Sequence, residues 1–463
     1  MTVTALPVRS ERTGGRWSSP ELLDDLLVLA AIERAVAHVI AGWVPKVHDL
    51  DDKLRLASCF EPSMGRAAAL RQHALTLLER DETGLTAGGT WVGALRGLDD
   101  DPDERRVVDA IVIDVATWLL SRYREMLVRA DPLYDARLIV TLQSAIDALD
   151  SGPWGQPRST SPTLSTTITG ALDDAWCDRT SPRISLDDVA WVPLDRVPFP
   201  ARPVERRRPE TGALGFYVQN SRTSEHEIAG ELNSNVLAEL AALELMCRCS
   251  YEHPELPWSF HVSVARHATD EARHAAIFRR LLFARGYRER DLPQYGTNYE
   301  LGYQFPECEP GGQRELVWRL LILCTVLEGL ALDRMPVEIA TRDWLDQPDI
   351  ARALDYIAAD ELFHVENGLQ WTRRLCDELN LDPMLERELV HGRFFGRQRD
   401  ARLVYLEVDP ERAAREIELL DAPDPDAVPF VPRTEVELRR RASFTDAECE
   451  QVDRWGYNGA KRR

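Results

Sequence analysis

The motif Asp-Glu-x-x-His occurs twice in this chain, and this repetition constrains the fold more than any other feature of the sequence. The first copy covers residues 270–274 and the second covers residues 360–364. A glutamate and a histidine three residues apart on an α-helix lie about 60° apart around the axis, with a rise of about 4.5 Å, so both side chains can reach one point beside the helix. Two such helices that face each other can hold two metal ions if two further carboxylates come from other helices.

Two further carboxylates stand at matching places upstream of the two motif copies. The segment that starts at Glu239 reads Glu-Leu-Ala-Ala-Leu-Glu-Leu-Met, and the segment that starts at Glu328 reads Glu-Gly-Leu-Ala-Leu-Asp-Arg-Met. Glu239 precedes Glu271 by 32 residues, and Glu328 precedes Glu361 by 33 residues. A spacing of this size suits half a helix, a loop and half of a returning helix. Two matched Glu…Glu-x-x-His units therefore predict a dinuclear carboxylate site.

The apolar pattern places these polar residues on the buried faces of helices. Around the second motif copy, residues at alternating steps of three and four form one seam of a helical bundle. The residues of this seam are Leu354, Ile357, Glu361, His364, Gly368, Trp371 and Leu375. Charged groups are almost never fully buried unless they are paired or bind a metal ion, so packing alone does not explain the glutamate and the histidine. The predicted metal ligands are Glu239, Glu271, His274, Glu328, Glu361 and His364.

Two other acids leave the choice of upstream ligand open. Glu244 lies five residues beyond Glu239, and Asp333 lies five residues beyond Glu328. Five residues correspond to about 140° around a helix, so both members of a pair cannot face one site. We favour Glu239 over Glu244, because its spacing to the motif matches the spacing in the second half.

Supporting groups are predicted around the ligands. Asp270 and Asp360 suit hydrogen bonds to the histidine nitrogens that do not bind metal, and such bonds orient the rings. Glu244 and Asp333 are assigned to a supporting shell or to salt bridges. Arg273 or Arg334 is the expected partner of these two acids.

The positions of helical periodicity, Pro and Gly divide the 463 residues into four parts. Residues 1–150 are expected to form a helical bundle without metal, because Met64 stands where a histidine ligand would be needed. Residues 151–223 are rich in Pro and Ser and are predicted to be a connector. Residues 224–380 hold both motif copies in a four-helix bundle with a long crossover. Residues 381–463 are interpreted as a helical extension that acts as a lid, as packing, or as an oligomer contact such as a homodimer interface.

Composition disfavours several classes of protein. A hydrophobic content of 44% and a charged content of 29% are typical of a globular protein. No apolar run approaches the roughly 20 residues of a membrane span, and the N-terminus lacks the pattern of a signal peptide. The eight cysteines have no paired spacing, which favours a reduced cytoplasmic setting without a membrane. The net charge of −21 disfavours a nucleic-acid partner.

Four segments of the chain resemble the ferritin-like di-iron carboxylate superfamily, and specifically its DUF455 group, which is close to the di-iron tRNA hydroxylases. These segments are residues 238–246, 270–274, 327–333 and 360–364. The resemblance implies an all-α fold with a ferritin-like four-helix bundle. Residues 1–150 would then be either a degenerate ferritin-like domain or an unrelated helical domain. The group often carries a histidine where this chain has Ala238, so any role of that histidine is absent here.

The resemblance also implies the activity. Two iron ions, with manganese or a mixed Mn/Fe pair as alternatives, would activate O2 at the four glutamates and two histidines, which would be the catalytic residues. The implied enzyme is a di-iron oxidase or oxygenase that hydroxylates, desaturates or N-oxygenates a small-molecule or carrier-bound substrate, with O2 and an electron donor as partners. Two alternatives remain open. One is metal handling by ferroxidase, storage or peroxide-scavenging activity, and the other is tRNA hydroxylation, which the acidic charge disfavours.

Overall fold

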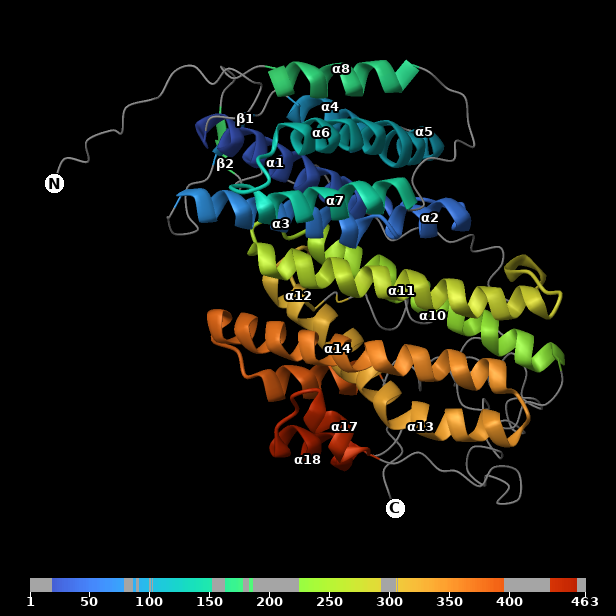
Figure 1. Cartoon of the computed structure of the whole chain (residues 1–463). Coiled ribbons are helices and arrows are strands. Elements are labelled where there is room, and N and C mark those ends of the chain that lie inside the picture. The colour runs from blue at the N-terminus through green and yellow to red at the C-terminus, as the bar shows by residue number, and fades with distance from the viewer. Residues whose placement is uncertain are drawn as a thin grey trace. The chain divides into compact units, whose positions relative to one another are not determined.

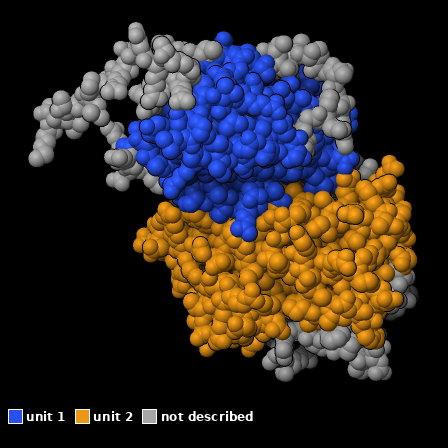
Figure 2. All heavy atoms as spheres, viewed as in Figure 1, with its two compact units in different colours: residues 1–197, 250–269 blue, residues 198–249, 270–463 orange. Residues whose placement is uncertain are grey.

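Nearly all described residues of the computed structural model are helical (Figure 1). The structure describes residues 19–78, 86–88, 91–99, 101, 103–151, 163–177, 183–185, 225–292, 305, 307–394 and 434–455. They fall into two compact units, drawn in blue and orange in Figure 2. The first unit comprises residues 1–197 and 250–269, and the second comprises residues 198–249 and 270–463. The predicted all-α class is confirmed, because the described strands form only one short antiparallel pair, β1 (Thr86–Gly88) with β2 (Arg183–Ser185).

The first unit is built around its first helix, which contacts the three helices that follow it. The helical elements are α1 (Ser19–Trp43), α2 (Leu50–Ala57), α3 (Phe60–Leu78), α4 (Val92–Asp99), α5 (Glu104–Asp109), the π-helical segment η1 (Ala110–Val115), α6 (Ala116–Arg129), α7 (Ala136–Ser151) and α8 (Thr163–Cys177). Helices α5, η1 and α6 follow one another without a break, so the π-helical turn lies inside one long helix. The bundle predicted for residues 1–150 is thus helical throughout most of its described length.

Helix α1 corrects the expectation that no apolar run approaches membrane-spanning length. Its segment from Glu21 to Trp43 is long and apolar enough to cross a membrane by length and composition alone. The reason is that Glu33, Arg34 and His38 are the only polar residues from residue 26 to residue 43. The apolar window is completely buried inside the structure, and a core helix of a globular protein passes the same test.

Helix α8 corrects part of the predicted connector over residues 151–223. Residues 163–177 are helical, and Ile168, Leu172 and Trp176 form a buried face at steps of four. The ring of Trp176 meets that of Trp118 edge-on, with centroids 6.2 Å apart. This apolar face outweighs the Ser- and Thr-rich composition that favoured a linker. Residues 152–162, 178–182 and 186–223 of the predicted connector lie outside the described residues.

The second unit contains the helices that carry both motif copies. The helical elements are α10 (Glu225–Tyr251), α11 (Trp258–Ala284), the short 3-10 turn η4 (Glu289–Asp291), α12 (Gln313–Leu320), the π-helical segment η6 (Leu321–Leu327), α13 (Glu328–Trp344), α14 (Pro348–Leu379), residues 383–394, α17 (Val436–Arg441) and α18 (Asp446–Trp455). The last two residues of α10 and residues 258–269 of α11 belong to the first unit. The predicted crossover joins α11 to α12, and its residues 293–304 lie outside the described residues. Helices α12, η6 and α13 are continuous, so Glu328 begins an α-helical stretch directly after a π-helical one.

A glycine allows α14 to approach η6 closely. A Cβ atom at Gly368 would lie 2.1 Å from the Cβ of Cys324 and 2.7 Å from its Sγ. Gly368 follows His364 by one helical turn, and Cys324 precedes Glu328 by one turn. The absent side chain therefore lets the helices that carry these two predicted ligands pack at short range.

The C-terminal helices pack against α13 and α14. Leu332, Val365 and Leu369 form a buried cluster with Phe444 and Val452. From the sequence, residues 381–463 are interpreted as a lid, as packing or as an oligomer contact. The described part of this region packs within its own unit. Residues 395–433 and 456–463 lie outside the described residues.

A buried carboxylate anchors the last of these helices. Glu448 of α18 accepts hydrogen bonds from Arg387 at 2.8 Å and from Arg373 at 2.5 Å. The backbone amide of Thr445 also donates to it, at 2.7 Å. Burial alone would raise the pKa of Glu448, but Arg387 and the Thr445 amide outweigh burial and lower this pKa to about 2.

Substitution of Gly368 tests the close approach of α14 and η6. We expect Gly368→Ala to lower the free energy of unfolding by about 1–3 kcal/mol, because Cys324 has to move to accept the methyl group. Gly230→Ala in α10 is the control, since a Cβ there meets no atom within 4 Å. It should be neutral or stabilising by about 0.5–1 kcal/mol. Urea unfolding measures both, and equal effects of the two substitutions would contradict the close packing at Gly368.

Substitution of Glu448 tests the anchor of α18 through its pH dependence. We expect Glu448→Gln to destabilise the protein at pH 7 by roughly 2 kcal/mol, because hydrogen bonds between charged groups are lost. The folded pKa lies below the ordinary value of 4.5, so the carboxylate stabilises the fold above about pH 4.5 and loses this contribution as the pH falls toward 2. Urea unfolding of both proteins at several pH values should show a difference that shrinks on acidification. A difference that does not vary with pH would be evidence against the ionised anchor.

Candidate metal centre

The structure brings all six predicted ligand residues together in the second unit. They come from four helices, with one glutamate from each of α10 and α13 and a Glu-x-x-His pair from each of α11 and α14. The side chains are nearly inaccessible except one: exposed fractions are 0% for His274 and His364, 1% for Glu271, 5% for Glu361, 7% for Glu328 and 17% for Glu239. Glu239 is therefore the ligand candidate closest to solvent.

One half of the cluster surrounds the Nδ1 atom of His274. This atom lies 3.6 Å from a carboxylate oxygen of Glu271, 3.8 Å from one of Glu361 and 3.9 Å from one of Glu239. It has no hydrogen-bond partner among the described residues. The ring nitrogen and the three carboxylates thus lie around a common point.

The other half surrounds the Nδ1 atom of His364 in the same way. This atom lies 3.1 Å from the second oxygen of Glu271, 3.6 Å from the second oxygen of Glu361 and 3.9 Å from an oxygen of Glu328. Glu271 and Glu361 therefore direct one oxygen toward each histidine, as carboxylates that bridge two ions would. Glu239 lies on the His274 side and Glu328 on the His364 side.

Each supporting aspartate contacts the histidine of the opposite helix. Asp360 of α14 lies 3.1 Å from Nε2 of His274, and Asp270 of α11 lies 3.4 Å from Nε2 of His364. The guanidinium of Arg273 joins the two aspartates, at 2.6 Å from Asp360 and 2.8 Å from Asp270. Hydrogen bonds at Nε2 leave both Nδ1 atoms directed into the cluster. Arg273 is 42% exposed, so this network runs from the surface to both rings.

The titration behaviour of the cluster follows from buried like charges. Burial and the carboxylates of Glu271, Glu361 and Glu328 raise the pKa of Glu239 well above its ordinary value. Burial would lower the pKa of His274, but Asp360 and the neighbouring glutamates outweigh it and raise this pKa to about 9. The cluster thus attracts positive charge strongly, and a metal ion bound at Nδ1 would displace a proton.

The spacing of the ligand atoms fits metal ions. Atoms bound to one ion at about 2.0–2.2 Å lie no more than about 4.4 Å apart. The ligand atoms of one group all lie within 4.8 Å of one another, and this group is Glu239, Glu271, His274 and Glu361. The same limit holds for the group Glu271, Glu328 and His364. Small side-chain movements would close either group around an ion, so the second unit contains buried Glu and His clusters that could hold metal.

The partner predicted for Asp333 needs correction. Asp333 pairs with Arg439 of α17 at 2.6 Å and not with Arg273 or Arg334. Arg334 instead pairs with Glu338 one turn later on α13, at 2.8 Å. Arg439 stands 106 residues away from Asp333, and no local sequence pattern connects the two. Glu244 is buried at 1% exposure, but it belongs to neither ligand group.

Arg273 of α11 has a role that the predicted pairing with Glu244 or Asp333 does not describe. Arg273 joins the two aspartates, and its spacing of three residues from Asp270 was the available signal. His267 is completely buried and precedes Glu271 by four residues, which places it on the same face of that helix.

The first unit holds a buried glutamate of a different kind. Glu33 of α1 is fully buried and accepts hydrogen bonds from Arg66 at 2.5 and 3.0 Å and from the hydroxyl of Tyr123. Arg66 also donates to Ser63, at 3.1 Å. A guanidinium therefore neutralises this carboxylate inside the protein. Met64, which stands where the motif would need a histidine, is also buried and directly follows Ser63 in the chain.

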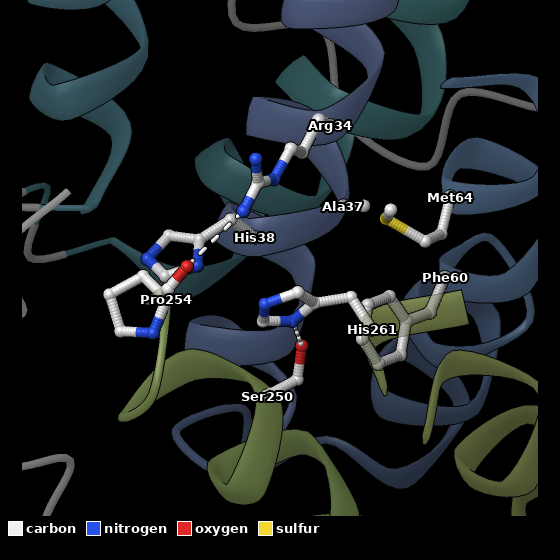
Figure 3. Close-up of a pocket in the computed structure, with 8 residues that line it drawn as sticks. All are labelled: Arg34, Ala37, His38, Phe60, Met64, Ser250, Pro254 and His261. Atoms are coloured by element: carbon white, nitrogen blue, oxygen red, sulfur yellow. Dashed lines mark hydrogen bonds between the residues drawn. The ribbon is translucent and has the colours of Figure 1, made fainter. Parts of the chain in front are cut away.

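A separate cavity in the first unit is lined by two neutral histidines (Figure 3). His261 lies 2.9 Å from the hydroxyl of Ser250 through Nδ1 and 3.1 Å from the carbonyl of Leu256 through Nε2. His38 stacks on Tyr251 with ring centroids 4.5 Å apart. Burial and the charge of Arg34 lower the pKa of both histidines to about 3. His261 is thus a hydrogen-bonded core group and His38 a stacked one.

Comparisons with known proteins locate the chain in one family. The profile of the family described as "Protein of unknown function (DUF455)" matches residues 158–401, which are 244 of the 463 residues. The matched region contains both motif copies and all six ligand candidates. Neither the curated proteins nor the solved structures include a match to this chain. Since the match covers more than half of its length, the chain belongs to the DUF455 family.

Proposed function

We propose that the second unit binds two iron ions and acts as an O2-dependent oxidase or oxygenase with a ferritin-like bundle. The observation that carries the proposal is the convergence of three buried glutamates, the partly exposed Glu239 and two histidine Nδ1 atoms on common points. The four carboxylates repel one another, and burial together with this repulsion raises the pKa of Glu239. Bound cations would remove this repulsion, whereas packing alone would favour apolar residues at these positions.

The donor set favours iron or manganese. Carboxylate oxygens with a minority of imidazole nitrogens suit these ions better than soft thiolate-binding metals. Glu271 and Glu361 would bridge the two ions, with His274 and Glu239 on one ion and His364 and Glu328 on the other. When bound, a pair of iron(II) ions supplies the electrons that activate O2.

The protein residues would hold and shield this centre. Asp360 and Asp270 fix the orientation of the two imidazole rings, and Arg273 holds the aspartates in place. Glu239 is the most exposed ligand candidate, so O2 and a small or carrier-bound substrate would approach from its side. Five of the six ligand side chains are at most 7% exposed, which keeps water from most of the site.

Metal content and reaction with O2 test the proposal. The full-length protein should bind about two iron ions, and addition of O2 to the Fe2+ form should produce a new charge-transfer absorption. Glu361→Ala and His364→Ala should each bind fewer than about one ion, because each removes a ligand at the shared centre. Glu378→Ala on the same helix is the matched control, since its side chain is 48% exposed, and it should bind as much iron as the parent.

Other outcomes would point elsewhere. If Glu361→Ala and His364→Ala bind as much iron as the parent protein, the ligand assignment is wrong. Uptake of many irons per chain would favour the storage alternative. If the protein binds two irons but accelerates only the consumption of peroxide, peroxide scavenging would be favoured. If it forms a product on tRNA, the hydroxylase alternative would be favoured.

A further inference from the structure

Arg439 of the C-terminal helix α17 reaches the turn of α13 that carries Glu328. Its Nε and Nη2 atoms donate to the carboxylate of Asp333 at 3.1 and 2.6 Å. Nη2 also donates to the backbone carbonyl of Gly329 at 2.7 Å. Gly329 is the residue directly after Glu328, and Asp333 is one turn further on. One side chain from α17 thus binds two successive turns of α13, starting beside a ligand candidate.

The side chain of Arg439 is buried among close neighbours. The side chain is 1% exposed, and its guanidinium lies 5.0 Å from the ring centroid of Phe444. A Cβ atom at residue 329 would lie 3.2 Å from Nη1, so glycine makes room for the guanidinium. The amide of Glu435 donates to Asp333 at 2.9 Å, which adds a second link from the C-terminal segment to the same carboxylate.

The turn that Arg439 holds is one that needs external support. The π-helical segment η6 ends at Leu327, and the amide of Glu328 donates to the carbonyl of Leu323, five residues earlier. Single π-helical turns inside α-helices are less regular than the helix around them. Gly329 is also a weak helix former. The orientation of Glu328 toward His364 therefore depends on contacts from outside α13.

We propose that Arg439 is a positioning residue for the metal centre, and that α17 and α18 form part of the site by holding the turn that presents Glu328. The inference rests on the proposed function, because it assigns Glu328 to one of two metal ions. Glu328 lies on the His364 side of the cluster and Glu239 on the His274 side. Loss of Arg439 should therefore weaken the binding of one ion more than the binding of the other.

Titration of the full-length protein with Mn2+ tests this asymmetry. The parent should bind about two ions, and Arg439→Met should keep one affinity while the second becomes weaker by at least about tenfold. Arg440→Met is the matched control on the same helix, because Arg440 pairs only at the surface with Asp446, and it should bind as the parent does. In a Glu328→Gln background, Arg439→Met should add no further weakening, since both changes act on the same ion.

A second variant covers the case in which Arg439→Met does not fold. Arg439→Lys keeps a positive charge beside Asp333 but lacks the planar fork that also reaches the carbonyl of Gly329, so it should still weaken the second ion. Unchanged affinities in a folded Arg439 variant, or equal weakening of both ions, would overturn the positioning role alone. A parent protein that binds no Mn2+ and no iron would overturn the proposed function and this inference with it.

Discussion

Mutual repulsion among four clustered glutamates is the constraint on which the second unit depends. Each of the helices α10, α11, α13 and α14 brings one of these carboxylates to the middle of the bundle. Burial and the like charges of the other three raise the pKa of Glu239 well above its ordinary value. Apolar contacts must hold the helices together on either side of this polar layer. The close approach at Gly368 and the cluster around Val365 and Leu369 supply such contacts beside the layer. The protein thus maintains an arrangement that bound cations would stabilise.

The same chain also contains the ordinary solution to the burial of a carboxylate. In the first unit, Glu33 is neutralised by the guanidinium of Arg66 and the hydroxyl of Tyr123. A guanidinium placed in this way occupies the space that an ion would need and supplies the positive charge that an ion would supply. In the second unit the cationic groups closest to the ligand oxygens are two histidine rings, which can give up a proton to bind metal. This difference, and not the presence of buried acids as such, distinguishes a metal-binding arrangement from a structural ion pair.

The local part of the site could be predicted from the sequence, and the long-range part could not. Glu361 and His364 share one helix face because of their spacing, so a motif and a seam suffice to place them. The exchange of aspartates between helices, with Asp360 at His274, depends on how α11 and α14 face each other. The partner of Asp333 stands 106 residues away, and no local pattern marks the π-helical turn before Glu328. Helix α8 is hard to predict for another reason, because the Ser and Thr content of its segment favours a linker although its apolar residues recur at steps of four.

The two halves of the repeat have the same ligand types but differ in helix geometry and in the exposure of their upstream glutamates. Glu328 follows a π-helical segment, is 7% exposed, and lies in a turn held by a buried arginine. Glu239 lies inside an uninterrupted α-helix and its side chain is 17% exposed. A carboxylate that shifts between binding modes needs free space beside it, and the exposed side of the cluster offers that space to Glu239 but not to Glu328. On the proposed function, substrate and O2 would therefore enter on the side of the cluster that contains His274 and Glu239. The C-terminal helices contact the other side, which contains His364 and Glu328.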